Sequence, residues 1–257
     1  MAVILVAIFV IGYDVMLICL GLLSLIAAFE LNRALKIQWS VPAFLAYGTI
    51  IAHYVCLRFV ESKYIILVYA VSLIIYLAVF VITYPKFELL EIFGSYFTIF
   101  YAGVSLSFLY LLRIHPPSGA FLVWLAVFSS WGCDIAAYLI GMKFGKHPFV
   151  PKLSPKKSIE GAVGGIIGAV LFSVIYGIII QKYVPDIKSA PLVFGIVAIF
   201  GAAAGQIGDL AASAIKRKVG IKDYGRLIPG HGGIMDRFDA MILVAPMMYI
   251  ITIYAVM

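Results

Sequence analysis

The chain has 257 residues, of which 64% are apolar and only 12% are charged, and its mean hydropathy is +1.11. Soluble globular domains carry about twice that share of charged residues, so this composition excludes an ordinary soluble fold. The net charge of +7 does not indicate nucleic acid as a partner either, because the cations have no aromatic residues interleaved with them for base stacking. We expect an all-α, polytopic integral membrane protein.

Apolar runs of membrane-spanning length, which is about 20 residues, recur along nearly the whole chain. Residues 1–12 are too short to cross alone and lack the basic region and cleavage site of a signal peptide, so we expect a shortened first helix, trimmed at its start. Eight full-length spans are predicted after it, at residues 15–31, 41–60, 63–84, 92–112, 119–142, 161–183, 190–215 and 238–257.

Positive charge falls on alternate loops between the predicted spans. Fourteen of the 19 lysines and arginines lie in the loops at residues 30–40, 84–91, 143–160 and 216–237, and five lie in the opposite loops. The positive-inside rule therefore places the first set in the cytoplasm. In the first two of these loops, orientation and attraction to anionic lipid explain the cations; the two later loops are too densely charged for that explanation.

The two parts of the chain differ in composition. Residues 1–118 carry bulky aliphatic and aromatic side chains, and we predict that they form a scaffold with oligomer contacts. In this part Asp14, Glu30 and Glu61 lie near predicted helix ends, where solvated or capping acids are the simpler interpretation. Residues 119–257 bring frequent glycine, acids inside spans and long basic loops, and we predict that they form the catalytic transmembrane region.

Two acids lie inside predicted spans of this second part. Asp134 precedes Lys143 by nine residues and Asp209 precedes Lys216 by seven. At about 1.5 Å per residue they lie roughly 13 Å and 10 Å from the cytoplasmic helix ends. A charge at that depth costs on the order of 2.5–3.5 kcal/mol, which favours a functional role over a single structural acid hydrogen-bonded between helices.

One face of the helix at residues 190–215 combines small, acidic and basic side chains. Gly201, Gly205, Asp209, Ser213 and Arg217 follow one another at i, i+4 spacing. The glycines admit a close neighbour, and an acid, a hydroxyl and a cation then follow toward the cytoplasm.

The first dense basic loop reads "LSPKKSIEGAVGG" at residues 153–165 and leads into a glycine-rich helix. Lysines are point charges that suit phosphate, and a helix N-terminus presents free N–H groups to an anion. We therefore expect Lys156, Lys157 and Ser158 to bind phosphate, with a solvated basic loop as the simpler alternative.

The second dense basic loop reads "KRKVGIKDYGRLIPGHGGIMDRFD" at residues 216–239, and its glycines permit close backbone approach. Asp236 and Asp239 are three residues apart at the predicted start of the final helix, near its positive end. Carboxylates this close favour a cation between them, and together with Asp209 they predict Mg²⁺, which takes oxygen ligands and keeps water and substrate phosphate in its shell. Zinc is disfavoured because only His231 is nearby.

The segment "SAIKRKVGIKDYGRLIPGHGGIMDRFD", residues 213–239, resembles the signature of the phosphatidate cytidylyltransferase family, also called CDP-diacylglycerol synthases. We call it the signature segment. "WGCDIAAYLIGMKFGK" and "SPKKSIEG" resemble further blocks of that family, so the similarity covers residues 119–257, whereas the first half matches only as a set of hydrophobic spans. The resemblance implies the reaction CTP + phosphatidate → CDP-diacylglycerol + pyrophosphate, dependence on a divalent metal, and a homodimer.

The resemblance also implies roles for residues of this chain. Asp236 and Asp239 carry over as metal ligands, with Asp209 as the third carboxylate, and the pattern leaves room for a second cation, monovalent or divalent. The residues expected to neutralise the triphosphate or pyrophosphate are Lys216, Arg217, Lys222 and Arg237. The other predicted substrate-binding residues are Ser213, Asp223, His231 and Asp134. For Asp223 and His231 a cytidine contact, loop ordering and phosphate binding all remain open, and Asp134 either supports the site from behind or orients a lysine.

The expected partners are CTP, phosphatidate and membrane lipid, with no nucleic acid, and the expected location is a bacterial plasma membrane with the site facing the cytoplasm. Two alternatives remain. A CTP-dependent kinase of a lipid alcohol would transfer the γ-phosphoryl group and would need a general base, for which the sequence offers no clear residue. An ion or anion transporter would use the acids as an ion path but would leave the long signature segment unexplained.

Overall fold

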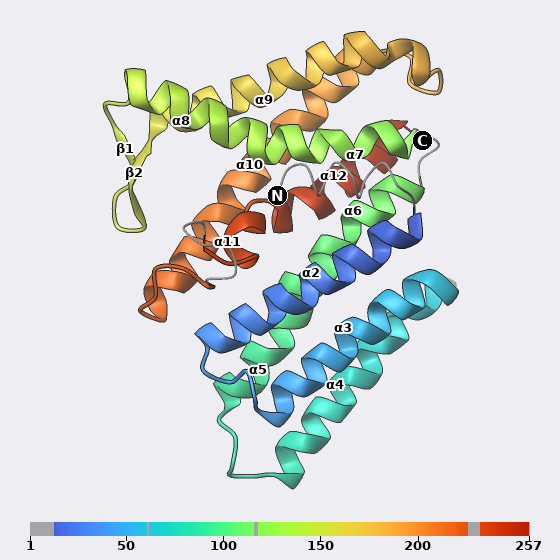
Figure 1. Ribbon diagram of the computed structural model, residues 1–257, viewed down its shortest axis with the longest axis vertical. Coiled ribbons are helices and arrows are strands. Elements are labelled where there is room, and N and C mark those ends of the chain that lie inside the picture. The colour runs from blue at the N-terminus through green and yellow to red at the C-terminus, as the bar shows by residue number, and fades with distance from the viewer. Residues whose placement is uncertain (1–12, 61, 116–117, 226–231, 257) are drawn as a thin grey trace. The chain divides into compact units, whose positions relative to one another are not determined.

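The computed structural model describes residues 13–60, 62–115, 118–225 and 232–256, and these are mostly helical (Figure 1). Within this part of the chain, eight helices are long and apolar enough to cross a membrane: Tyr13–Ala34, Val41–Phe59, Ile65–Ile82, Leu89–Ile114, Gly119–Phe144, Ile159–Tyr183, Ala190–Lys218 and Met235–Tyr254. The predicted all-α, multi-pass membrane fold and its eight full-length spans are confirmed. The predicted short helix at residues 1–12 lies outside the described residues.

The chain packs as two compact units, which we describe separately. The first unit consists of Asp14–Ser107 and Lys218–Arg237, and the second contains Phe108–Arg217 and the residues from Phe238 onward. By packing, the described residues 218–225 and 232–237 of the signature segment thus belong with the N-terminal helices. The predicted functional division at residue 118 stays a prediction.

Four transmembrane helices make up most of the first unit. Its elements in chain order are α2 (Tyr13–Ala34), α3 (Val41–Phe59), the 3-10 turn η1 (Ser62–Tyr64), α4 (Ile65–Ile82), α5 (Leu89–Thr98) and the π-helical segment η2 (Ile99–Val104), which leads into α6 (Ser105–Ile114). Two pairs of buried polar side chains in this unit hydrogen-bond each other, which offsets the cost of burying polar groups in apolar surroundings. Ser24 hydrogen-bonds Tyr54 at 2.8 Å, and the Thr98 hydroxyl donates to the Asn32 side-chain oxygen at 3.1 Å.

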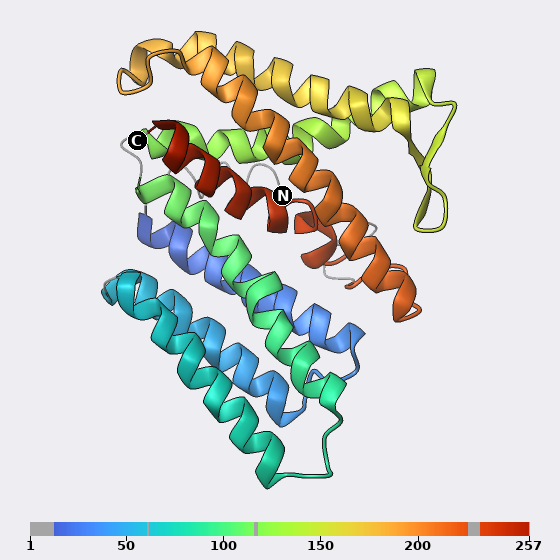
Figure 2. The same ribbon diagram turned by 180° about the vertical axis from the view of Figure 1, so that it is seen from behind.

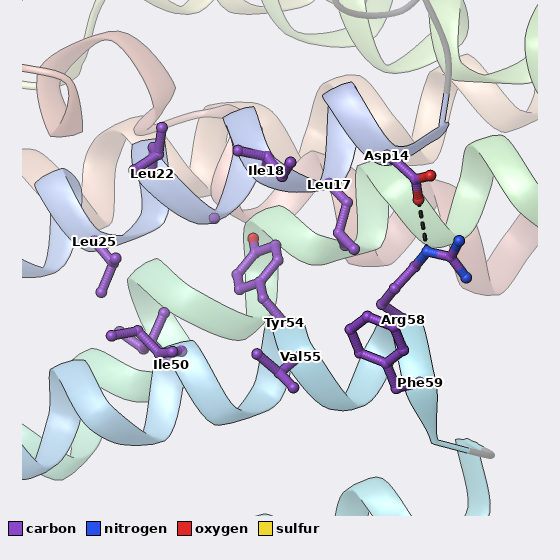
Figure 3. Close-up of a pocket in the computed structure, with 12 residues that line it drawn as sticks. Asp14, Leu17, Ile18, Leu22, Leu25, Ile50, Tyr54, Val55, Arg58 and Phe59 are labelled. Carbon is purple, nitrogen blue, oxygen red and sulfur yellow. Dashed lines mark hydrogen bonds and ion pairs between the residues drawn. The ribbon is translucent and has the colours of Figure 1, made fainter.

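A largely apolar groove of about 450 Å³ lies between α2 and α3 of the first unit (Figure 3). Asp14 and Arg58 close one end with an ion pair of 2.6 Å, while Leu25 and Ile50 lie toward the other end. Its lining offers no cluster of groups for catalysis. The groove is suited to acyl chains or packed side chains rather than to chemistry.

The second unit contains the remaining spans. Its elements are α7 (Gly119–Val127), the π-helical segment η3 (Phe128–Gly132), α8 (Cys133–Phe144), β1 (Pro148–Val150), β2 (Ser154–Ser158), α9 (Ile159–Ile180), the 3-10 turn η4 (Gln181–Tyr183), α10 (Ala190–Lys218) and α12 (Met241–Val256). The short helix α11 (Met235–Phe238) joins the two units along the chain. Because α7, η3 and α8 follow one another without interruption, they form one membrane-spanning helix. The π segment is a wider turn near its middle.

Helices α8 and α9 lie side by side in both views of the molecule (Figures 1 and 2), because glycines of α9 allow their backbones to meet. A Cβ added to Gly165 would lie 2.9 Å from the carbonyl oxygen of Cys133, and one on Gly161 would lie 2.9 Å from that of Ala137. The glycine-rich start of α9 is therefore explained by helix packing.

Helices α10 and α12 also approach closely, through the small-residue face that the i, i+4 pattern predicts. A Cβ on Gly201 would lie 2.7 Å from the Met248 sulfur, and one on Gly208 would lie 2.7 Å from the carbonyl oxygen of Asp239. Residue 209 is thereby brought to the chain segment that contains Asp239.

Two local features differ from the sequence-based expectation. The loop expected at residues 143–160 contains a short antiparallel hairpin, in which Pro148 pairs with Ser158 and Val150 with Ser154. The final helix, expected to be continuous from Asp236, is interrupted by a turn at Asp239 and Ala240 before α12 begins. In this turn the Ala240 N–H donates to Asp239 Oδ1 at 2.8 Å, so the side chain supports a local break in the helix.

Candidate active site

Three acids and two lysines of the second unit form what we call the acid–lysine cluster: Asp134, Lys157, Asp209, Lys216 and Asp239. The Lys157 ammonium donates to Asp209 Oδ2, and this ion pair joins the hairpin to α10. The charges of Asp134 and Asp239 both interact with that of Asp209 and with each other, while Lys157 offsets the charge of Asp134 and Lys216 that of Asp239. The cluster thus collects charges from α8, the hairpin, α10 and the turn before α12.

The local sequence explains how these side chains meet. Asp134 stands in the first turn of α8, directly after the π-helical segment η3. Lys157 lies on β2, one residue before Ser158, whose hydroxyl caps α9 by accepting the Gly161 N–H at 3.1 Å. The helix cap therefore fixes the chain direction immediately beside the lysine.

The acid–lysine cluster is partly open to solvent, since the side chains of Lys157 and Asp209 are 32% and 23% exposed. An exposed ion pair contributes on the order of 1 kcal/mol or less to stability. Solvent can therefore reach both charged groups of this ion pair.

The carboxylate of Asp236 lies in the first unit and makes different contacts. Its Oδ2 accepts the backbone N–H groups of Tyr224 at 2.8 Å, Gly233 at 3.0 Å and Gly225 at 3.4 Å. We call residues 224–225 and 232–236 the loop base. Asp236 thus links the two strands of chain that enter and leave the loop of the signature segment.

A polar cavity of about 680 Å³ adjoins the loop base. It is lined by Arg33, Ala34, Ile221, Lys222, Asp223, Tyr224 and Gly225. Lys222 and Asp223 are both exposed there, as a role in binding a charged, water-soluble substrate requires. Arg33 adds a second cation to this cavity from the end of α2.

The remaining predicted residues are placed as follows. Lys156 is exposed on β2, and Ser213 is partly buried and Arg217 exposed near the end of α10. Arg237 is exposed on α11. His231 lies outside the described residues, so its predicted role stays a prediction.

The predicted magnesium site can be compared with the donors that are present. Asp134, Asp209 and Asp239 offer carboxylate oxygens, the donor type that Mg²⁺ prefers. Among the residues that the structure describes, however, no three His, Cys, Asp or Glu side chains gather closely enough to hold a metal ion by themselves. The donor chemistry therefore fits a Mg²⁺ ion that takes carboxylate oxygens and completes its shell with water and substrate phosphate.

Glu30 has a role that the sequence did not predict, because an acid near a helix end is expected to be solvated or to cap the helix. The residue is only 3% exposed, and its Oε2 accepts the Met235 N–H of the loop base at 2.8 Å. The available signal was "FELNR", residues 29–33, which places an acid, an amide and a cation within one turn of an otherwise apolar helix. This segment lies at the same predicted membrane face as the signature segment.

Eight apolar spans and a cluster of acids and lysines define a multi-pass membrane protein with a site suited to phosphate chemistry. Comparison with known proteins identifies the group: the chain belongs to the cytidylyltransferase family, whose model matches residues 1–255. A relative named phosphatidate cytidylyltransferase from Aquifex aeolicus is 36% identical over 65% of this chain and 60% of its own length.

Two staphylococcal relatives carry the same name. The one from Staphylococcus saprophyticus is 31% identical over 67% of this chain and 64% of its own length. The one from Staphylococcus aureus is 32% identical over 94% of this chain and 91% of its own length. The chain thus spans about three fifths of the first two relatives and nearly all of the third.

Proposed function

We propose that this chain transfers the cytidylyl group of CTP to phosphatidate, forming CDP-diacylglycerol and pyrophosphate. The observation that carries the proposal is family membership across residues 1–255. The acid–lysine cluster supports it, because a nucleotide and a lipid phosphate both need cations beside groups that can hold a metal.

The chemistry requires positioning and charge neutralisation more than proton transfer. A non-bridging oxygen of the phosphatidate phosphate attacks the α-phosphorus of CTP and forms a new P–O bond. The bond from the α-phosphorus to the oxygen of the β-phosphate breaks, and that oxygen leaves with pyrophosphate. A phosphate monoester has its second pKa near 6, so it is largely dianionic at about pH 7 and needs no strong base.

The described residues divide this work by their positions. Lys157 would release Asp209 and bind a substrate phosphate, and Lys156 and Ser158 flank it on the same strand. Asp134 orients Lys157 through their opposite charges. The residues that would neutralise triphosphate or pyrophosphate are Lys216, Arg217, Lys222 and Arg237. Ser213, Asp223 and His231 would complete the contacts to the substrates.

We further propose that Asp236 and Asp239 hold Mg²⁺, with Asp209 as the third carboxylate, and that a second monovalent or divalent cation can join it. When bound, the metal would polarise the phosphates and offset their charge. The fit rests on the donor chemistry of the acids. We also propose a homodimer, and a bacterial plasma membrane location with the site open to the cytoplasm, in agreement with the one-sided distribution of lysine and arginine.

The test is an assay of the purified full chain in detergent micelles that contain phosphatidate and a polyprenol, with Mg²⁺ and with CTP that carries label at either the α- or the γ-phosphorus. We expect α-label in the lipid phase and γ-label in released pyrophosphate. γ-Label in the lipid would instead identify a kinase. No turnover of either nucleotide, combined with ion uptake into liposomes, would identify a transporter.

A further inference from the structure

The cytoplasmic end of α2 holds both arms of the loop base. Glu30 Oε2 accepts the Met235 N–H at 2.8 Å, and the carboxylate also interacts with the backbone of Ile234. One turn further along α2, Arg33 Nη2 donates to the carbonyl oxygen of Tyr224 at 2.6 Å. Two side chains of one helix thus contact the chain on either side of the loop.

Two glycines of the loop base are required by this arrangement. A Cβ added to either Gly225 or Gly233 would overlap the Glu30 carboxylate, and the Cα atom of Gly233 would lie 2.8 Å from a Cβ on Gly225. The two arms therefore meet each other over Glu30. Glycine at both positions is explained by the close approach of this acid.

Glu30 and Asp236 use the loop base in complementary ways. Asp236 Oδ2 accepts N–H groups from both arms, whereas Glu30 comes from a distant part of the sequence and accepts from the second arm. A buried carboxylate that accepts backbone N–H groups is stabilised in place, and removing it leaves those donors unsatisfied. The end of α2 thus fixes the position of the loop base against the other helices of the first unit.

We propose that Glu30, assisted by Arg33, is a positioning residue for nucleotide binding and transfer. Glu30 holds the loop base so that Lys222 and Asp223 line the adjoining cavity. It also fixes the backbone at Met235, and thereby the direction of the chain that continues to Asp236 and Arg237. This proposal rests on the proposed function, because the substrates that it positions are those of cytidylyl transfer.

The first measurement is amide hydrogen exchange on the full chain in detergent, which requires no enzymatic activity. In Glu30→Ala we expect exchange at Ile234 and Met235 to accelerate roughly ten- to a hundredfold, since their hydrogen bonds to a charged acceptor are lost. Glu30→Gln keeps the shape and one acceptor oxygen, so the acceleration should be much smaller. Arg33→Ala changes an exposed side chain and should accelerate exchange at Tyr224 and Gly225 without loss of folding.

The matched control is Asn32→Ala, which removes a buried polar side chain two residues along α2. Asn32 pairs with Thr98 of α5 and not with the loop base. We expect this variant to lower thermal stability while leaving exchange at Ile234 and Met235 at the native rate.

The second measurement is steady-state kinetics with CTP and phosphatidate. We expect Glu30→Ala to raise the KM for CTP and lower kcat, together about hundredfold in kcat/KM, and Glu30→Gln to recover most of the loss. Equal losses in the Glu30→Ala and Asn32→Ala variants, or native exchange at Ile234 and Met235 in a folded Glu30→Ala protein, would overturn the proposal. If Glu30→Ala accelerates exchange but the native chain transfers no cytidylyl group, the proposed function is overturned, whereas the contact of Glu30 with the loop base is established.

Discussion

The acid–lysine cluster and the loop base both concentrate carboxylates, but they satisfy them in different ways. In the cluster, Asp209 faces the ammonium group of Lys157, a side chain that can move. In the loop base, Glu30 and Asp236 accept backbone N–H groups, which are fixed by the chain itself. The comparison indicates that the first arrangement can change when one side chain moves, whereas the second is held by the backbone itself.

The largest effect is expected where a carboxylate of the cluster loses its charge. Asp209→Asn and Asp239→Asn should each reduce cytidylyl transfer by about 10³-fold, because groups that stabilise developing charge at a reaction centre have effects of this order. Thermal unfolding in detergent should remain close to native. Substantial transfer by either variant, measured with α-labelled CTP, would contradict the metal assignment.

Asp236→Asn tests both kinds of carboxylate at once, because Asp236 is predicted to bind metal and also accepts backbone N–H groups from both arms of the loop base. We expect transfer to fall by about 10²- to 10³-fold and amide exchange at Gly233 to accelerate, since an amide is a weaker acceptor than a carboxylate. Exchange in Asp239→Asn serves as the control and should be native at the same residue. An active Asp236→Asn enzyme with fast exchange would show that Asp236 organises the loop without binding metal.

Two neighbouring lysines on β2 allow the effect of an ion-paired lysine to be compared with that of an exposed lysine. Lys157→Ala should lower kcat/KM about hundredfold and change the free energy of unfolding by no more than about 1 kcal/mol, because the ion pair with Asp209 is partly exposed. Lys156→Ala removes the same group one residue away, where the side chain is exposed, and should cost less than about tenfold. Equal losses in the two variants would show that the hairpin contributes only its total charge.

The smallest effect tests the packing that brings the acids together. Gly208→Ala places a Cβ 2.7 Å from the Asp239 carbonyl oxygen, so we expect a loss of about 1–3 kcal/mol in unfolding free energy and a partial loss of transfer. Gly48→Ala in α3 meets nothing within 4 Å and should stabilise the protein by about 0.5–1 kcal/mol. Thermal unfolding in detergent compares the two variants, and a neutral Gly208→Ala would argue against the tight contact of α10 with the chain at Asp239.

Hydropathy predicted the eight spans because a membrane-spanning helix needs a run of about 20 apolar residues, and such a run is visible in the sequence alone. The i, i+4 glycines of α10 likewise predicted a close neighbour, which is α12. The pairing of Lys157 with Asp209 joins residues 52 positions apart, and no local pattern encodes it. Glu30 was missed for the same reason, since an acid near a helix end looks solvated until the chain that covers it is known.

Local geometry was harder to predict than the spans. The hairpin at β1 and β2 has a polar, charged sequence that lacks the alternation of a strand, and its pairing depends on the helices that flank it. The turn at Asp239 and Ala240 interrupts a run that is apolar enough to continue as a helix. Both features arise from tertiary context, which outweighs local propensity in short segments.

The π-helical segment η3 has a consequence for how the acid that follows it is aimed. A π segment contains one more residue than the α-helical turn it replaces, and each residue of an α-helix turns the chain by about 100°. If Phe128–Gly132 became ordinary α-helix with every residue retained, the extra residue would rotate Asp134 by about 100° to another side of the same helix. The direction in which this carboxylate points is thus set by the width of one helical turn upstream, so a change in that turn would move Asp134 away from Asp209 and Lys157 although every side chain of the cluster was retained.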